Sequence, residues 1–362
     1  MSETNATILI PDISGFTEFM TTTELSHSTK AINMLIDAII KSAEDEYEVS
    51  EIEGDAVLLI RKEEAPSQKE IIDACLKIFT AFHAQRLWIQ HHAICPCGAC
   101  QAIGNLALKF VVHYGAVAEI KTGRFVKQSG AEMIIAHRLL KNSIDSNEYL
   151  LISEQLLRQS ADSAALVQLQ WTHSSEQYPS IGKVDYRYAL LNEARENILV
   201  PPQTQSNYEG EELINIQMHI NANYKDVYMV LMNIPGRPTW QQGLLKVEQE
   251  MDGVFVGSIH HCSFENYTTI VSPLSMQLSD STISYSEKCT IEEMDIILIH
   301  EFLCSQLTET ASSFSCRIIN TNSDAIPETL HDSLAAAAKQ MTERLKDFCE
   351  QTNVSAFKPM MR

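Results

Sequence analysis

Residues 197–212 interrupt the apolar pattern of this chain and divide it into two long parts. The stretch holds Pro201, Pro202 and Gly210 among polar residues, and it shows little helical or strand periodicity. Each flanking part has the length of an ordinary domain, about 50–250 residues, and 45% of the chain is hydrophobic. The sequence therefore predicts two domains with separate cores, at 1–196 and 212–362, joined by a linker over 197–211.

The N-terminal part mixes strand and helix signals in the order β-α-α-β-β-α-β-β-α. Apolar runs predict strands at 7–10, 48–53, 56–61, 107–113 and 115–120. Helical spacing of apolar residues predicts helices at 28–43, along Ile71 to Leu87, and at 131–141. Since such elements bury their apolar faces by packing helices on a sheet, we expect an α+β sandwich.

The C-terminal part has a different pattern. A strand is expected at 212–220, a helix at 223–233, further strands at 253–264, 282–291 and 295–304, and a closing helix over 327–350. In the closing helix, residues such as Leu334, Met341 and Leu345 form an apolar stripe. We expect an antiparallel sheet covered by this long terminal helix.

Composition limits the classes of function. The chain has 27 Lys and Arg against 47 Asp and Glu, a net charge of −20, which argues against a surface that binds nucleic-acid phosphates. No apolar run approaches the roughly 20 residues that cross a bilayer, and residues 1–11 lack the pattern of a secretory signal. We expect a cytoplasmic protein with no membrane span and no nucleic-acid partner.

Two aspartates lie at the ends of predicted strands. Asp12 ends the first strand and is followed at once by a turn and a helix, while Asp55 lies in the hairpin between 48–53 and 56–61. A strand-to-helix turn exposes backbone N–H groups that can bind phosphate, and a nearby carboxylate can hold a divalent cation. Each aspartate alone is equally typical of a helix cap or an ordinary turn.

Together these motifs resemble the catalytic domain of class III adenylyl and guanylyl cyclases. Asp12 to Thr17 is similar to the family's Asp-Ile-x-Gly-Phe-Thr turn, and Gly54-Asp55 to its hairpin. Val112 to Val117 and Gly130 to Arg138 are similar to its later strand and helix motifs, in the same order over residues 7–155. The resemblance implies a ferredoxin-like, cyclase-type α/β sandwich over about residues 5–195.

The resemblance also implies a site. Asp12 and Asp55 would bind two Mg²⁺ or Mn²⁺ ions, and the backbone of the turn would cradle the triphosphate of a purine nucleotide; the turn residues are Ile13, Ser14, Gly15, Phe16 and Thr17. Arg138 would stabilise the transferring phosphate in the site of an opposite subunit. Because cyclase sites form between two chains, a homodimer is implied.

Three positions depart from the family pattern. Ile134 stands where the family has an asparagine that donates to the transition state, and losing such a donor costs about 10²–10³ in rate. Glu51 and Lys127 stand where adenylyl cyclases have Lys and Asp. A Glu and a Lys can pair with the edge of guanine, although Glu51 also belongs to the acidic run 44–53, which is typical of a solvated face.

Nine cysteines without an export signal indicate reduced thiols. Cys95, Cys97 and Cys100 cluster after His92, in an insertion near 91–104 that ordinary cyclase domains lack. These four residues have the ligand types of a structural Zn²⁺ site. A redox-active thiol cluster and plain structural cysteines in a tight loop are the alternatives.

Residues 212–362 resemble the START-like (SRPBCC) helix-grip family. The resemblance is carried by Ile214-Asn215-Ile216, by Asn221 to Tyr228 and by Pro238-Thr239-Trp240. It implies a sheet that curls round a cavity for a hydrophobic small molecule.

Two functions follow from these features. In the first, the protein is a divergent cyclase-like signalling protein that binds a purine nucleoside triphosphate through two metals and is regulated by a hydrophobic ligand. In the second, a catalytically inactive cyclase-like domain dimerises or senses nucleotide and is coupled to a START-like binding or carrier domain. The retained Asp12, Asp55 and Arg138 favour the first, whereas Ile134 favours the second. A stand-alone carrier with an N-terminal assembly platform is a third alternative.

Overall fold

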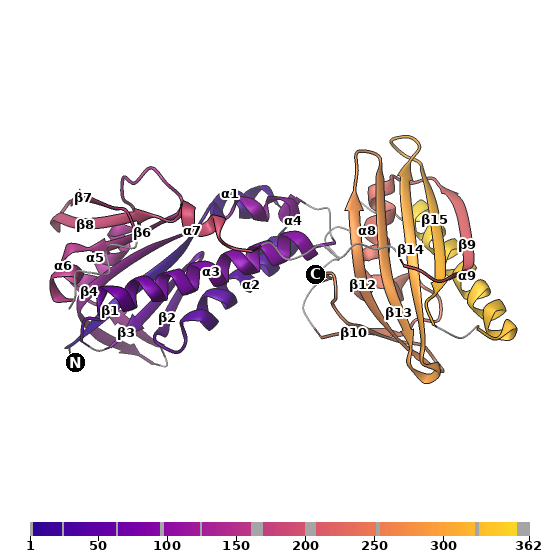
Figure 1. The fold of residues 1–362 in the computed structure, drawn as a ribbon, viewed down its shortest axis with the longest axis horizontal. Helices are drawn as coiled ribbons and strands as arrows, with labels where there is room; N and C mark the ends of the chain where they lie inside the picture. The colour runs from indigo at the N-terminus through magenta and orange to yellow at the C-terminus, as the bar shows by residue number, and fades with distance from the viewer. Residues whose placement is uncertain are drawn as a thin grey trace. The chain divides into compact units, whose positions relative to one another are not determined.

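The chain forms two compact units. The computed structural model describes residues 3–23, 25–62, 64–94, 98–123, 125–160, 169–199, 208–250, 254–322 and 326–352. The first unit comprises Met1–Gln90 and Gln101–Pro201, and the second comprises His91–Cys100 and Pro202–Arg362 (Figure 1). Residues 91–100 thus group with the second unit, although the residues on both sides of them in the sequence belong to the first.

In the described part of the first unit, eight strands form one mixed sheet in the order β2-β3-β1-β4-β6-β8-β7, with β5 pairing β4. Only the β4–β6 pair among them is parallel. The strands are β1 Glu3–Ser14, β2 Glu48–Glu53, β3 Ala56–Arg61, β4 Ala107–Thr122, β5 Phe125–Ser129, β6 Tyr149–Ser153, β7 Trp171–Tyr178 and β8 Gly182–Leu190.

Helices cover both faces of this sheet (Figure 1). On one face, Met133 and Ala136 of α5 pack on Ile8 and Ile10 of β1. On the other, Phe79 of α3 lies 6.5 Å from the ring of Phe110 in β4. The helices are α1 Phe16–Thr22, α2 Leu25–Ala43, α3 Gln68–His92, α4 Gly98–Ala102, η1 Ile103–Asn105, α5 Ala131–Leu139, α6 Glu154–Gln159 and α7 Asn192–Glu196.

The second unit is an antiparallel sheet with a long C-terminal helix. Its seven described strands run in the order β10-β11-β12-β13-β14-β15-β9. The elements are β9 Glu211–Ile220, α8 Tyr224–Met232, η3 Ile234–Thr239, β10 Lys246–Gln249, β11 His260–Ser263, β12 Thr268–Leu278, β13 Thr282–Ile291, η4 Glu292–Met294, β14 Ile296–Gln306, β15 Ser312–Asn320 and α9 Glu328–Gln351. The predicted α+β class, with a sheet closed by a terminal helix, is confirmed.

Three of the predicted strands were wrong. The strands expected at 107–113 and 115–120 are one continuous strand, β4, which runs through Gly115. Glycine at this position does not break the strand but makes room, since a Cβ there would lie 2.5 Å from Cγ of Glu132. The strand expected over 253–264 is reduced to β11, His260–Ser263, because residues 254–259 form turns closed by hydrogen bonds such as Ser258 N to Phe255 O.

Candidate functional site

Asp12 and Asp55 come together at one end of the first sheet. Strand β1 pairs with β3 so that Asp12 lies opposite Ala56, next to the β2–β3 turn that carries Asp55. Gly54 in this turn has a φ of 68°, a left-handed conformation that glycine adopts without strain. The backbone N–H of Ile13 donates to the Asp55 carbonyl oxygen at 3.2 Å, which fixes the turn against β1.

The two carboxylates repel each other. The pKa of Asp55 is raised, first by burial and then by the negative charge of Asp12. A cation that bridges both groups would relieve this repulsion, and carboxylate oxygens are the ligands that Mg²⁺ and Mn²⁺ prefer. The residues present therefore fit a divalent metal that takes its other ligands from phosphate and water.

Lys109 is a charged neighbour that the sequence patterns did not point to. It lies opposite Asp12 in the β1–β4 ladder, and its Nζ is 3.1 Å from Asp12 Oδ2. A lysine in the middle of the apolar run 107–113 was the available signal. Lys109 neutralises one of the two carboxylates, so a metal would have to displace or supplement it.

The predicted phosphate turn lies directly after Asp12. Gly15 has a φ of 86° and caps α1, and the backbone N–H of Phe19 donates to the Gly15 carbonyl oxygen at 3.0 Å. Ile13 and Ser14 belong to β1 and pair with Leu108 and Ala107. Because the Ile13 N–H is already bound to Asp55, the turn amides that precede Phe19 are the ones left for a phosphate.

Arg138 and Ile134 share the exposed side of α5. They are four residues apart, one helical turn, and both side chains are exposed, Ile134 by 56%. The backbone carbonyl of Arg138 accepts a 2.8 Å hydrogen bond from the Tyr178 hydroxyl, which fixes this end of the helix. The arrangement leaves both side chains open to a second molecule.

Glu51 and Lys127 meet as an ion pair. Lys127 Nζ donates to Glu51 Oε2 at 2.8 Å and lies 3.7 Å from Glu53 Oε1. The hydrogen bond from Lys127 lowers the pKa of Glu51, and the same bond raises the pKa of Lys127. The structure thus brings the two predicted purine-contact residues together, but with their polar groups bound to each other.

His113, from the strand motif, lies in a buried polar network. Its Nδ1 is 2.7 Å from Ser153 Oγ and its Nε2 is 2.6 Å from Glu132 Oε2. Ser153 also caps α6, since Leu156 N donates to its Oγ at 3.3 Å. Ser153 is only 1% exposed, so this Ser-His-Glu arrangement holds β4, α5 and α6 together and offers no accessible nucleophile.

Part of the predicted zinc site lies outside the described residues. Cys95 and Cys97 are not described, while His92 ends α3 and Cys100 lies in α4. The backbone carbonyl of His92 accepts a 2.8 Å bond from Val256 N, within the second unit. Among the described residues, no group of three or more His, Cys, Asp or Glu side chains is placed to hold a metal. The zinc site stays a prediction that elemental analysis can test.

The second unit contains a small cavity between its sheet and α9. The cavity measures about 110 Å³ and is lined by apolar side chains such as Met341 together with Arg237 and Glu287. At about 30 Å³ per water molecule, this volume suits a few waters or a very small ligand. Within the described ranges, no helix of either unit combines the length and apolar character needed to cross a membrane.

Two sequence comparisons find similar proteins, each over less than half of the chain. Residues 32–149 match the model of a family described as a protein of unknown function (DUF2652). An uncharacterized protein of Mycobacterium tuberculosis is 29% identical over 160 residues, which cover 43% of this chain and 72% of that protein.

Solved structures similar to this chain include several cyclases. The guanylyl cyclase Cya2 is 15% identical, with 52% of this chain and 92% of that chain covered and a TM-score of 0.38. The guanylyl cyclase domain of the RhoGC fusion protein from Blastocladiella emersonii is 15% identical, covering 52% and 98%, with a TM-score of 0.37. The adenylyl cyclase CyaB from P. aeruginosa is 15% identical, covering 52% and 95%, with a TM-score of 0.36.

Proposed function

We propose that the first unit binds a purine nucleoside triphosphate through two divalent metal ions held by Asp12 and Asp55, as a divergent cyclase-like signalling domain. The observation that carries this proposal is the meeting of the two aspartates. They come from motifs more than 40 positions apart, and the negative charge of Asp12 contributes to the raised pKa of Asp55. Two carboxylates that repel each other beside a turn with unused N–H groups suit a metal-bound polyphosphate.

The residues of the proposed nucleotide site would have separate roles. The metals would supply charge neutralisation of the phosphates and a more acidic ribose hydroxyl. The turn over Ile13 to Thr17 would hold the triphosphate, and Arg138 would reach the nucleotide held by a second copy of the chain. Lys127 and Glu51 would have to separate before either could bind a base, since they now bind each other.

Turnover is expected to be slow. Ile134 presents an apolar side chain one turn before Arg138 on the exposed side of α5. Ile134→Asn would restore a hydrogen-bond donor at this position and should raise the rate of cyclic-product formation by about 10²–10³. Chromatography of reaction mixtures with ATP or GTP and Mn²⁺ measures this, and an unchanged rate would mean that Ile134 does not limit turnover.

Binding can be tested separately from turnover. Equilibrium dialysis with labelled ATP and GTP should show Mn²⁺-dependent retention by the wild type and none by the double variant Asp12→Asn/Asp55→Asn. The matched control is Asp37→Asn, an exposed aspartate on α2. Equal retention by the double variant would refute the proposal, and the ratio of ATP to GTP retained gives the base preference.

A second candidate function rests on the cavity of the second unit. In this alternative the first unit is an inactive dimerisation or nucleotide-sensing domain, and the second unit binds or carries a small molecule. The 110 Å³ cavity favours a small ligand with a polar group rather than a lipid, because buried Arg237 and Glu287 line it beside Met341. Native mass spectrometry of the purified chain would detect a retained molecule.

A further inference from the structure

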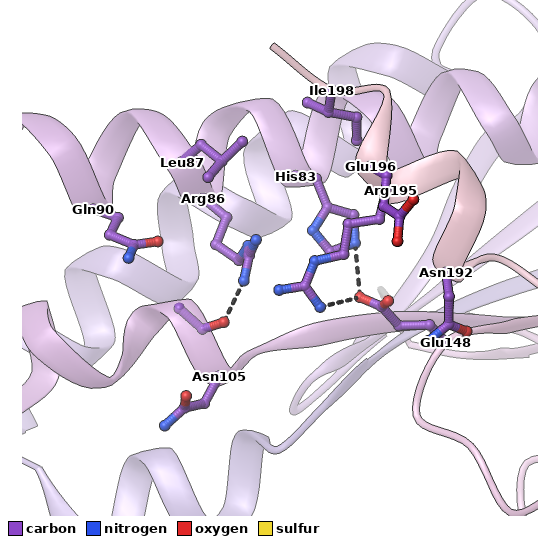
Figure 2. Close-up of a pocket in the computed structure, with 11 residues that line it drawn as sticks. His83, Arg86, Leu87, Gln90, Asn105, Glu148, Asn192, Arg195, Glu196 and Ile198 are labelled. Carbon is purple, nitrogen blue, oxygen red and sulfur yellow. Dashed lines mark hydrogen bonds and ion pairs between the residues drawn. The ribbon is translucent and has the colours of Figure 1, made fainter. Parts of the chain in front are cut away.

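A polar pocket lies in the first unit, away from the aspartates. Its volume is about 650 Å³, within the range of about 300–1,000 Å³ that is usual for small-molecule sites. Residues of α3, η1 and α7 line it, together with Glu148, which directly precedes β6 (Figure 2). The pocket lies on the α3 side of the sheet. Asp12 lies on the other side, because it shares a face of β1 with Ile8 and Ile10, which α5 covers.

Arg86 is a buried cation in this pocket without a carboxylate of its own. Its side chain extends from α3 and the residue is 3% exposed. Its hydrogen bonds to the described residues run from Nη1 to the backbone carbonyls of Gly104 and, at 3.5 Å, Leu106. Its buried Nε has no hydrogen-bond partner there. A buried guanidinium that is hydrogen-bonded only to neutral carbonyls would be stabilised by a negative charge placed beside it.

The one buried carboxylate of the pocket is already shared. Glu148 Oε1 accepts a 3.2 Å bond from Arg195 Nη1 and lies 3.1 Å from His83 Nε2, in a contact whose geometry is not that of a hydrogen bond. Burial lowers the pKa of His83, which keeps its ring neutral at neutral pH. Among the described residues that line the pocket, Glu148 is therefore the only buried carboxylate near Arg86 and Arg195, because Glu196, the other acidic residue of the lining, is exposed.

The two guanidinium groups lie close enough to affect each other. Figure 2 shows them pointing into the same space between α3 and Asn105. Burial first, and then the charge of Arg195, lowers the pKa of Arg86 to about 10, so Arg86 remains charged at neutral pH. Gln90 and Asn105 add amide groups to the wall. Like charges brought together in this way are stabilised by an anion that bridges them.

We propose that this pocket binds a small polar molecule through one oxyanion group, a phosphate or a carboxylate, held between Arg86 and Arg195. Guanidinium groups bind both oxyanions with paired hydrogen bonds. The amides of Gln90 and Asn105 would contact the polar remainder of the ligand. This ligand is additional to the nucleotide proposed at Asp12 and Asp55, and its binding does not depend on that site.

The test is calorimetric titration of the full chain with inorganic phosphate, ribose 5-phosphate and gluconate, with ribose as the neutral control. Saturable binding of phosphate is expected, and the two organic probes tell a phosphate preference from a carboxylate preference. Arg195→Gln should weaken binding by at least about tenfold, the effect of losing one charge-assisted hydrogen bond. Arg158→Gln, an exposed arginine on α6, is the matched control and should bind as the wild type does.

Two further variants keep the outcome unambiguous. Arg86→Gln should abolish binding, but Arg86 also holds Gly104 and this variant can fail to fold, so Arg195→Gln decides. Asp12→Asn/Asp55→Asn should leave binding intact. Absence of saturable binding with phosphate, ribose 5-phosphate and gluconate alike, unchanged binding in Arg195→Gln, or loss in the aspartate variant instead would each overturn the proposal.

Discussion

Arg237 and Glu287 form a doubly hydrogen-bonded ion pair that water scarcely reaches. Arg237 Nη1 and Nη2 donate to the two carboxylate oxygens at 2.9 and 2.7 Å, and the side chains are 4% and 1% exposed. The Tyr285 hydroxyl donates to the same carboxylate at 2.8 Å. Burial alone would raise the pKa of Glu287, but Arg237 and then His300 hold this pKa well below its usual range.

Glu287→Gln should destabilise the second unit by about 3–5 kcal/mol, because it leaves the Arg237 cation buried without its partner. The control is Glu212→Gln, which breaks an ion pair between Arg317 and Glu212 whose side chains are 45% and 42% exposed, and this loss should be much smaller because water screens the pair. Urea unfolding of the two variants measures both values. Similar losses would mean that burial does not set the strength of the pair.

Single residues also show what the sequence could and could not reveal about the site. The resemblance of their two motifs to the cyclase pattern implied that Asp12 and Asp55 meet, whereas the pairing of β1 with β3 that brings them together was not predicted. Lys109 was missed because register, not composition, places it opposite Asp12. Arg86 was missed because a long helix can carry an arginine on any side, and only the packed structure shows that this one is buried.

At the scale of elements, apolar periodicity predicted most boundaries to within a few residues. The helix expected at 131–141 is α5, Ala131–Leu139, and the closing helix expected at 327–350 is α9, Glu328–Gln351. Strand β4 was wrongly predicted as two strands, at 107–113 and 115–120, whereas it continues through Gly115, where a glycine in a strand marks a close approach of another element. Here that element is α5, through Glu132.

Gly115→Ala should therefore destabilise the first unit. The new Cβ would lie 2.5 Å from Glu132 Cγ and would push this side chain off His113, at a cost of about 1–3 kcal/mol for overpacking. The same substitution in a Glu132→Ala background should cost much less, because the clashing atoms are gone. Urea unfolding of the four proteins of this cycle measures the difference, and equal costs in both backgrounds would contradict the explanation.

At the scale of the whole molecule, each unit holds at least one histidine that folding keeps neutral. Burial lowers the pKa of His83 in the first unit and lowers that of His260 in the second to about 4. His260 is fully buried, and its Nε2 lies 2.9 Å from Ser258 Oγ. Since both pKa values are lower in the folded state, protonation favours unfolding.

The free energy of unfolding should consequently decrease as the pH is lowered. The contribution of His260 is fully present above the unfolded pKa of about 6.5 and decreases below it, by about 1.4 kcal/mol per pH unit until pH 4. Between pH 6.5 and 5 the free energy of unfolding of the second unit should drop by about 2 kcal/mol on this account. His260→Gln should flatten this dependence, whereas His173→Gln, an exposed histidine of the first unit, should not. A dependence that is identical in His260→Gln would contradict the assignment.

The central claim, that Asp12 and Asp55 form a metal site for a nucleotide, is tested most directly by counting bound Mn²⁺. The free-ion signal in electron paramagnetic resonance falls as Mn²⁺ binds, and it can be followed with a non-hydrolysable GTP or ATP analogue present. We predict nucleotide-dependent binding of two Mn²⁺ ions per chain in the wild type and in Asp37→Asn, and loss of that binding in Asp12→Asn/Asp55→Asn. The same Mn²⁺ binding in the double variant as in the wild type would contradict the claim.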